Sequence, residues 1–342
     1  MTLRSNRFIR LLGVAVAAIA VPAATATAAS AASLHGAGST LIAPLEQEWA
    51  AAYDSSHSGT SISYDAVGSG TGLKEIGAGQ VDFGASDAPL SASTTSCSGC
   101  VQMPWALTAT GVGFHINGLH KLHLTGPVLA QIYLGQIKFW NDKRIAKLQP
   151  KHTHLPHMQI TVFFRSDGSG DTYAFTDYLS RVSSSFKSKV GNGTAVSFPT
   201  GSGAKGNAGM VAALQATNGS IAYVAVSYLA AQWPRAAAIK NAAGRYETPN
   251  YGNIQDAAQS KSGLGGSNEI HIVDPSKKFK SAYPISTYTY VILKSGQANN
   301  GLAKSFVSYA INGGQSLGPR LDFVPIPGFV KSRDQSTLNG VH

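Results

Sequence analysis

Short apolar runs alternate along the chain with segments in which apolar residues recur at helical spacing. Residues 81–85 and 160–164 are short and largely apolar, as expected of buried strands. In residues 41–53, Leu45 and Trp49 lie four positions apart, so they would share one face of a helix. Because such strands and helices alternate, the pattern predicts an α/β protein with mainly parallel sheets.

The predicted elements show no internal repeat, and residues 254–268 are the most loop-like interior stretch. A length of 342 residues, 43% of them hydrophobic, is enough for a sizeable core and favours two domains. Strands are expected at residues 62–64, 81–85, 111–116, 160–164, 221–224 and 287–293. Helices are expected at residues 41–53, 128–139, 172–182, 209–216 and 303–312.

Three predicted junctions between a strand and a helix carry Gly together with Ser or Thr. Their sequences are HGAGSTLIAP (35–44), AVGSGTGLKEI (66–76) and FFRSDGSGDTYAF (163–175). A Ser or Thr at such a position can simply cap the helix. The same helix start also leaves backbone N–H groups free and favours negative charge. Three such junctions, one of them beside an Arg, therefore favour a bound anion.

None of these junctions has the sequence of a nucleotide-binding loop. VGSGTG lacks the Lys of a P-loop, and its glycine spacing differs from that of the dinucleotide fingerprint. The anion expected here is therefore not part of a nucleotide held by either motif.

The N-terminus has the features of a signal peptide. Arg4, Arg7 and Arg10 precede an apolar run at 11–21, and small residues follow. The run is too short to span a bilayer comfortably, although a retained membrane anchor is the alternative. No Cys stands near the expected cleavage point, which argues against lipid attachment. We expect residues 1–29 to be removed and the chain to be secreted, to the periplasm or to the cell surface and medium.

The chain is basic, with 27 Lys and Arg against 17 acids, and residues 1–29 account for three of the Arg. Such a surface can attract anions, acidic polymers or lipid headgroups. The basic residues look scattered along the sequence, which weighs against a nucleic-acid partner. The stretch KHTHLPH, at 151–157, holds three His without a Cys or an acid beside them. It predicts a solvated loop and no metal site.

Cys97 and Cys100 are the two cysteines of the chain. In an exported protein this spacing favours a small disulfide that closes a loop. A redox pair or half of a zinc site are the alternatives. Zinc would need two more ligands, and the nearby His115, His120 and His123 have no standard ligand spacing.

Several segments resemble, in order, the periplasmic phosphate-binding protein of the Pst-type ABC transporter. They are GAGSTLIAPLEQEWA, VGSGTGLKEIGAGQVDFGASDAPL, LAQIYLGQIKFWND, RSDGSGDTYAFTDYL, KGNAGMVAAL, SIAYV and YPISTYTYVIL. DFGASDAPL and RSDGSGDT are the most specific of them. The resemblance covers nearly the whole chain after the N-terminal segment.

The resemblance implies a type II periplasmic-binding-protein fold of two lobes, each a mixed sheet flanked by helices. Two crossing strands would form the hinge, near residues 113–117 and 284–289. Lobe 1 would combine residues 34–113 with 287–342, and lobe 2 would be residues 114–286. The lobes of this family close on one phosphate ion.

The resemblance also assigns phosphate ligands in lobe 1. They lie in the first two Gly-Ser junctions and in DFGASDAPL. Ser39 and Thr40 stand at the first junction, where Thr40 would offer its hydroxyl and backbone N–H. Leu41 replaces a Phe found in relatives, but the contact there is through the backbone N–H. Ser69 would be a hydroxyl donor, and Asp87 would be the carboxylate that binds phosphate directly.

The third junction would supply the ligands of lobe 2. Arg165 matches the cationic side chain at the site, and Asp167 matches the acid that orients it. Ser169 and Gly170 match donors at the helix start. An ordinary ion pair on a loop is the alternative interpretation of Arg165 and Asp167.

Asp171 departs from the pattern RADGSGTS, in which the same position is Thr. It could contact phosphate, cap the helix or pair with Arg165, and Thr172 could then supply the hydroxyl. If Asp171 also accepts a proton from the ligand, the site would favour the phosphate monoanion.

Asp87 gives a physical reason to expect phosphate. Near neutral pH phosphate still carries a proton and sulfate carries none. An ionised Asp87 accepts the phosphate O–H, but against sulfate two oxygen atoms with lone pairs would face each other. Buried polar sites strongly reject a ligand that leaves a partner unmatched.

The leading hypothesis is therefore capture of inorganic phosphate by a monomer and its delivery to a membrane permease. No enzymatic activity, metal, cofactor or nucleic acid is expected. The alternatives are a secreted phosphohydrolase on the same scaffold, a binding protein for another oxyanion such as sulfate or molybdate, and an adhesin or scavenger without a permease. A hydrolase would need a nucleophile or a metal pair, and the sequence shows no convincing metal cluster near the anion motifs.

Overall fold

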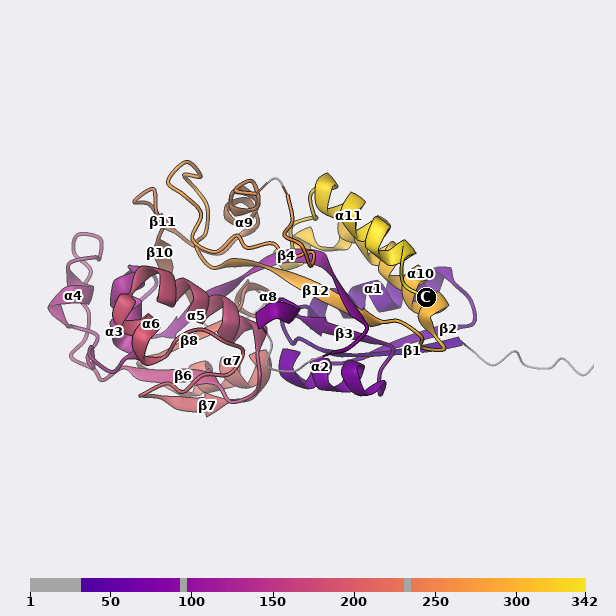
Figure 1. Ribbon diagram of the computed structural model, residues 1–342. Helices are drawn as coiled ribbons and strands as arrows, with labels where there is room; N and C mark the ends of the chain where they lie inside the picture. The colour runs from indigo at the N-terminus through magenta and orange to yellow at the C-terminus, as the bar shows by residue number, and fades with distance from the viewer. Residues whose placement is uncertain (1–31, 93–96, 231–234, 262) are drawn as a thin grey trace, which may run out of the picture. The chain divides into compact units, whose positions relative to one another are not determined.

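The structure is a computed structural model that describes residues 32–92, 97–230, 235–261 and 263–342 (Figure 1). The expected signal peptide, residues 1–29, lies outside these ranges. Within them, no helix is long and apolar enough to cross a membrane.

The strands form one sheet of nine and one of three. The larger sheet has the order β2-β1-β3-β12-β4-β8-β6-β7, and β9 also pairs with β4. The smaller sheet has the order β11-β10-β5. The strands are β1 (Ala32–Gly38), β2 (Thr60–Asp65), β3 (Phe83–Ser86), β4 (Cys100–His115), β5 (His123–Leu124), β6 (Thr161–Arg165), β7 (Ser202–Ala204), β8 (Ser220–Ala225), β9 (Arg235–Ala236), β10 (Ala238–Lys240), β11 (Tyr246–Glu247) and β12 (Ser286–Lys294).

Strand β4 belongs to two groups of strands. Its residues 100–109 pair with β12, and residues 110–115 pair with β8. Where the partner changes, the N–H of Thr110 donates at 3.0 Å to the carbonyl of Ile285, which leads into β12. The chain therefore crosses between the two groups here, while the lobe boundaries given above remain a prediction.

The expectation of mainly parallel sheets is wrong at the centre of the larger sheet. β1 pairs in parallel with β2 and β3, and β6 pairs in parallel with β7 and β8. β12 is antiparallel to both β3 and β4, and β4 is antiparallel to β8. The reason is that β4 and β12 are crossing strands, whereas the parallel strands are joined through helices.

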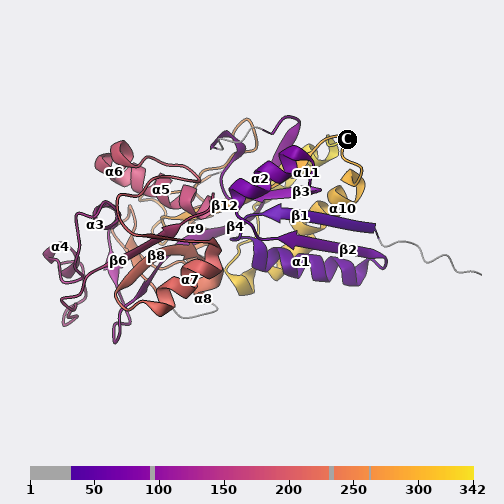
Figure 2. The same cartoon turned by 90° about the horizontal axis from the view of Figure 1, so that it is seen from below.

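Helices cover the strands of both groups. Figures 1 and 2 show α1 and α2 beside β1 to β3, and α5 and α7 beside β6 and β8. The helices are α1 (Ala43–Ser56), α2 (Ser69–Ala78), α3 (Gly126–Tyr133), α4 (Lys143–Ala146), α5 (Gly170–Val182), α6 (Ser184–Lys189), α7 (Gly206–Ala216), α8 (Val226–Ala230), α9 (Tyr251–Ala258), α10 (Asn300–Ile311) and α11 (Gly328–Asn339). The short 3-10 helices are η1 (Leu90–Ala92), η2 (Gly313–Leu317) and η3 (Pro319–Leu321).

Several predicted elements have other bounds, and the strand expected at 111–116, for instance, begins at Cys100. The helix expected over residues 128–139 ends at Tyr133, because Gly135 adopts a positive φ of 69° that an α-helix does not allow. The stretch expected to be loop-like, 254–268, begins with the second half of α9. There Ile254, Ala257 and Ala258 are buried. Their spacing of three and four positions is typical of a helix and could have predicted this one.

Aromatic residues fill the cores beneath the two groups of strands. Trp49 of α1 packs on Trp105 of β4, with ring centroids 5.1 Å apart. On the other side Phe175 of α5 lies between Tyr133 and Tyr223, at 4.7 Å and 4.5 Å. Since α5 begins at the third Gly-Ser junction, this packing fixes where that junction lies.

A disulfide bond joins Cys97 to Cys100 at the start of β4, so the predicted disulfide is confirmed. A zinc site would need both sulfur atoms as free thiolates and does not fit this bond, whereas a redox pair forms the same bond in its oxidised state.

Asp334 of α11 is a buried acid without a partner. Its side chain is fully buried, and neither carboxylate oxygen has a hydrogen-bond partner among the described residues. Burial raises the pKa of Asp334 to about 8. The folded protein therefore keeps this carboxyl protonated at pH values where the unfolded chain ionises it.

We predict that Asp334→Asn stabilises the protein, and increasingly so as pH rises. Stability from a raised carboxyl pKa is complete below the unfolded pKa, near 4, and is lost as pH rises to about 8. The neutral amide removes that loss, so the gain in the free energy of unfolding should reach on the order of 1–3 kcal/mol at the alkaline end.

Urea denaturation at several pH values measures this effect. Asp65→Asn, a change of the same kind at an exposed side chain, should shift stability by no more than about 0.5 kcal/mol. A gain from Asp334→Asn that stays constant across the pH range would contradict the assignment.

Candidate functional site

The three Gly-Ser junctions and the Asp87 motif meet in the structure. The N–H of Ser39 donates to the carbonyl of Ala85 at 2.9 Å, which joins the first junction to the strand before Asp87. The N–H of Gly70 donates to the carbonyl of Gly168 at 3.0 Å, which joins the second junction to the third. Of the predicted site residues, Asp167 is partly exposed, and the rest are buried: Ser39, Thr40, Leu41, Ser69, Asp87, Arg165, Ser169, Gly170, Asp171 and Thr172.

Ser39 holds the carboxylate of Asp87. Its hydroxyl lies 2.7 Å from Oδ1 and 2.6 Å from Oδ2, and the same oxygen accepts the N–H of Leu41 at 3.0 Å. Ser39 follows β1 and Asp87 follows β3, and these strands are neighbours in the sheet. The parallel pairing therefore brings the two side chains together at the carboxyl ends of the strands.

Ser69, the first residue of α2, connects Asp87 with the third junction. Its hydroxyl oxygen accepts the N–H of Gly170 at 3.1 Å and lies 3.4 Å from the N–H of Asp87. A Cβ atom on Gly170 would lie 2.4 Å from the Cβ of Asp87, so only glycine fits here. The start of α5 is thus packed directly against the Asp87 backbone.

Arg165 lies between two carboxylates. Its Nε donates to Asp167 Oδ1 at 2.8 Å and its Nη2 pairs with the other oxygen of Asp167. On the opposite edge, Nη1 donates to Asp171 Oδ2 at 3.1 Å. A guanidinium has five N–H donors, so two remain beyond these contacts with described residues. The pair of Arg165 and Asp167 is therefore part of a buried network and not an isolated ion pair on a loop.

Asp171 joins four elements of the fold. Its Oδ1 accepts the hydroxyl of Thr110, at the point where β4 changes partner, at 2.7 Å. Its Oδ2 accepts from Arg165 and also from Asn207 Nδ2 at 2.8 Å. Of the roles considered for Asp171, pairing with Arg165 is what this geometry shows. The helix cap is supplied by Ser169, whose hydroxyl accepts the N–H of Thr172 at 3.3 Å.

Thr172 and Thr40 are engaged with residues that the motifs did not single out. The hydroxyl of Thr172 lies 2.8 Å from the hydroxyl of Tyr223, which also accepts the N–H of Arg165 at 2.9 Å. The hydroxyl of Thr40 accepts Nδ2 of Asn207 at 2.9 Å.

Asn207 is a site residue that sequence reasoning missed. It is fully buried near the start of α7, and its amide reaches both Thr40 and Asp171, while Oδ1 accepts the N–H of Ala225 at 2.8 Å. It lies in KGNAGMVAAL, one of the segments that resemble the phosphate-binding family. The sequence signal for Asn207 was its place directly after Gly206, the glycine with which the helix begins.

Burial and like charge raise the pKa values of the two inner acids. Burial is the main cause at Asp87, the charge of Asp171 adds to it, and the pKa is about 7. Burial also raises the pKa of Asp171, against the opposing charge of Arg165. Burial alone would raise the pKa of Asp167, but the hydrogen bond and charge of Arg165 lower it. Two carboxylates and one guanidinium thus share a site with little water.

The arrangement can bind a small oxyanion that carries a proton. Helix N-termini, hydroxyl groups and the remaining N–H groups of Arg165 are donors, and Asp87 is an acceptor in the same place. Among the described residues, no group of three His, Cys, Asp or Glu could hold a metal ion.

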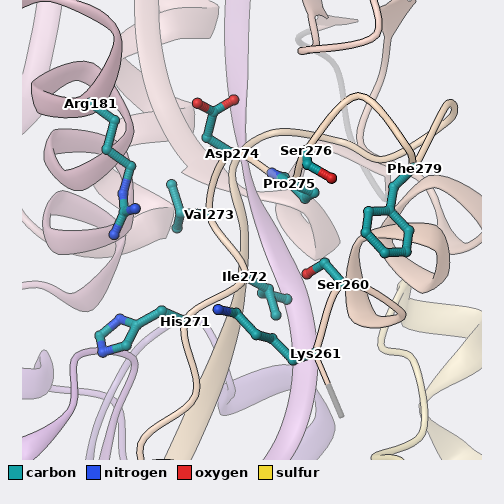
Figure 3. A pocket seen from close by; sticks show the side chains of 10 residues that line it. All are labelled: Arg181, Ser260, Lys261, His271, Ile272, Val273, Asp274, Pro275, Ser276 and Phe279. Atoms are coloured by element: carbon teal, nitrogen blue, oxygen red, sulfur yellow. The ribbon is translucent and has the colours of Figure 1, made fainter. Parts of the chain in front are cut away.

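A cavity of about 400 Å³ lies away from these residues (Figure 3). Its wall includes Arg181, Lys261, His271, Asp274 and Phe279, none of which belongs to the predicted site. The chemistry therefore points to the buried cluster, not to the open cavity.

Known proteins resemble this chain over most of its length. A family model described as the PBP superfamily domain matches residues 23–313. The phosphate-binding protein PstS of Xylella fastidiosa (strain 9a5c) is 36% identical over 299 residues, which cover 86% of this chain and 81% of that protein. PstS of Haemophilus influenzae is 33% identical over 314 residues, covering 89% and 92%.

The chain belongs to the PstS family of the PBP superfamily. A solved phosphate-binding protein from Stenotrophomonas maltophilia has the same fold, with a TM-score of 0.66, 19% identity and coverage of 90% of this chain and 94% of that one. The expected two-lobed type II α/β fold is thereby confirmed.

In this member of the PstS family, Asn207 should contribute measurably to stability. We predict that Asn207→Ala lowers the free energy of unfolding by about 1–3 kcal/mol, because it leaves the N–H of Ala225 without its acceptor and removes one of the two donors to Oδ2 of Asp171. Asn192→Ala, at an exposed position, should change it by less than about 0.5 kcal/mol. Urea denaturation measures the free energy of unfolding of both variants. Equal losses in the two would show that the contacts of Asn207 are not formed.

Proposed function

We propose that this protein binds inorganic phosphate outside the cytoplasm and delivers it to the permease of an ABC transporter. The observation that carries the proposal is Asp87. It is a buried carboxylate, held by Ser39 at 2.6–2.7 Å, among the donors of three helix starts and beside Arg165. The names of the PstS relatives support the same ligand.

In the proposed complex, the donors neutralise the ion and Asp87 selects it. Thr40, Leu41 and Ser69 would bind from the side of β1 to β3. Arg165, Ser169 and Gly170 would bind from the side of β6, with Asp167 orienting the guanidinium. Asp171 and Thr172 would support this second set, through Arg165 and Tyr223.

Because these two sets come from strands on either side of the crossing at Thr110, binding would couple to hinge motion. Phosphate bound to both sets favours the closed arrangement. A monomer with residues 34–113 and 287–342 in one lobe and 114–286 in the other would suffice. The closed form would then dock on the permease, and no catalytic step is needed. A phosphohydrolase would require a nucleophile or metal pair at this site, and no observation favours one.

We predict that Asp87→Asn reduces discrimination between phosphate and sulfate by roughly a hundredfold or more. The neutral amide lacks the negative charge with which the carboxylate accepts the phosphate O–H. Its NH2 group can also donate to a sulfate oxygen, which the carboxylate repels. Isothermal calorimetry of the exported chain, stripped of ligand, measures both affinities. Asp65→Asn should leave both unchanged. Unchanged discrimination in Asp87→Asn would refute the role given to this carboxylate.

The unsubstituted protein should itself lose discrimination in acid. The pKa of Asp87 is about 7, so the carboxyl is increasingly protonated below that pH and can then donate to sulfate. Calorimetric titrations with both ions above and below this value should show the ratio of phosphate to sulfate affinity falling as pH falls. A ratio that does not depend on pH would contradict this, and a protein that binds neither ion would remove the proposed function.

We predict that Asp171→Asn moves the pH of strongest phosphate binding upward. Two carboxylates beside the ligand favour its monoanion, and removal of one negative charge favours the dianion. Calorimetry across the pH range in both proteins tests it. Identical pH profiles would show that Asp171 does not select the protonation state of the ligand.

A further inference from the structure

Most of the net positive charge of residues 30–342 lies in one stretch. Residues 118–158 hold six Lys and Arg and a single acid, Asp142. The rest of residues 30–342 holds 18 Lys and Arg against 16 acids. The basic residues are therefore not scattered evenly, contrary to the expectation from the sequence. Such an asymmetry favours contact with an anionic partner.

Backbone and side-chain contacts gather this stretch into one surface. Gln149 accepts the N–H of His123 at 3.0 Å and donates to its carbonyl at 2.8 Å. The N–H of Trp140 donates to the carbonyl of Met158 at 2.9 Å, and the N–H of Ile160 donates to that of Lys138 at 2.8 Å. Figures 1 and 2 both show α4 lying beyond α3, away from β6.

The charges on this surface are not neutralised from within. Asp142 is already paired with Arg144, at 2.7 Å from Nη2 and 2.9 Å from Nε. Five lysines are exposed, and none forms an ion pair with a described residue: Lys121, Lys138, Lys143, Lys147 and Lys151. Exposed charges that serve only solubility are normally mixed in sign. Apart from the pair of Asp142 and Arg144, the acidic and basic side chains (Asp, Glu, Lys and Arg) of residues 118–158 are all lysines.

An exposed aromatic side chain lies among these cations. Phe139 follows Lys138 directly and is 40% exposed, the only large hydrophobic side chain so exposed in the described ranges. Its ring stacks on His157 with centroids 4.8 Å apart and planes 6° from parallel. The isolated β-bridge between Phe139 and Gln159 fixes the backbone beneath it. The ring is therefore held at the surface by the fold.

We propose that this surface, the five lysines with Phe139, binds an anionic lipid bilayer. Each Lys near such a bilayer gains electrostatic attraction to its headgroups, and an aromatic ring can enter the boundary between headgroups and acyl chains. A soluble polyanion would use the lysines but would not need Phe139, which is why the lipid surface fits better. The inference does not depend on phosphate binding, since the surface shares no residue with that site.

The experiment is sedimentation of the exported chain with vesicles. Vesicles of phosphatidylcholine mixed with phosphatidylglycerol should bind the protein, less so as salt is raised, and vesicles of phosphatidylcholine alone should not. The triple variant Lys143→Gln, Lys147→Gln, Lys151→Gln should weaken binding roughly tenfold or more. The matched control is Lys277→Gln, Lys278→Gln, Lys280→Gln, which removes the same charge from another exposed segment and should have little effect.

Phe139→Ser separates the lipid from other anions. It should reduce vesicle binding severalfold and leave binding of soluble polyphosphate unchanged. Equal losses in the two triple variants would overturn the proposal, because total charge and not this surface would be responsible. Binding of polyphosphate without binding of the anionic vesicles would overturn it as well, and would assign the surface to a soluble polyanion.

Discussion

The buried guanidinium of Arg165 is the group around which the site is built. A cation with 1% of its side chain exposed requires paired negative charge, which Asp167 and Asp171 supply from opposite edges. Asp167 is tied to the start of α7 through Gly206, and Asp171 is tied to Asn207 and to Thr110 of β4. The requirement to satisfy one buried charge thereby fixes the mutual positions of α5, α7 and the crossing strand.

The same network would let the two proposed sets of phosphate ligands act together. Thr110 lies where β4 leaves β12 for β8, and its hydroxyl contacts the acid that holds Arg165. A change at this crossing would therefore move the guanidinium relative to Asp87. Asn207 contributes from the other direction, because its amide reaches Thr40 beside β1 as well as Asp171. In the proposed complex, a movement at the crossing strands would therefore also move the groups that hold the ion.

Much of the site could be predicted from local sequence, but its connections could not. The Gly-Ser junctions indicated an anion site because each carries its own chemistry within a few residues, whereas the resemblance of DFGASDAPL to the family is what assigned a role to Asp87. Asn207 and Tyr223 have no such local signature, and their roles come from contacts across 167 and 58 residues of chain. Similarly, the alternation of strands and helices predicted the α/β class, while the antiparallel β12 depends on pairing over nearly 200 residues.

The sequence by itself determined the elements, the helix starts and the kinds of donors and acceptors, because these depend on hydrophobic spacing and on neighbouring residues. Tertiary structure alone decided which acids share a site and which are isolated. Asp87 and Asp171 are 84 positions apart but are close enough for like charge to raise a pKa, whereas the buried carboxylate of Asp334 has no hydrogen-bond partner among the described residues. Electrostatic coupling depends on distance and burial, and neither quantity exists until the chain has folded.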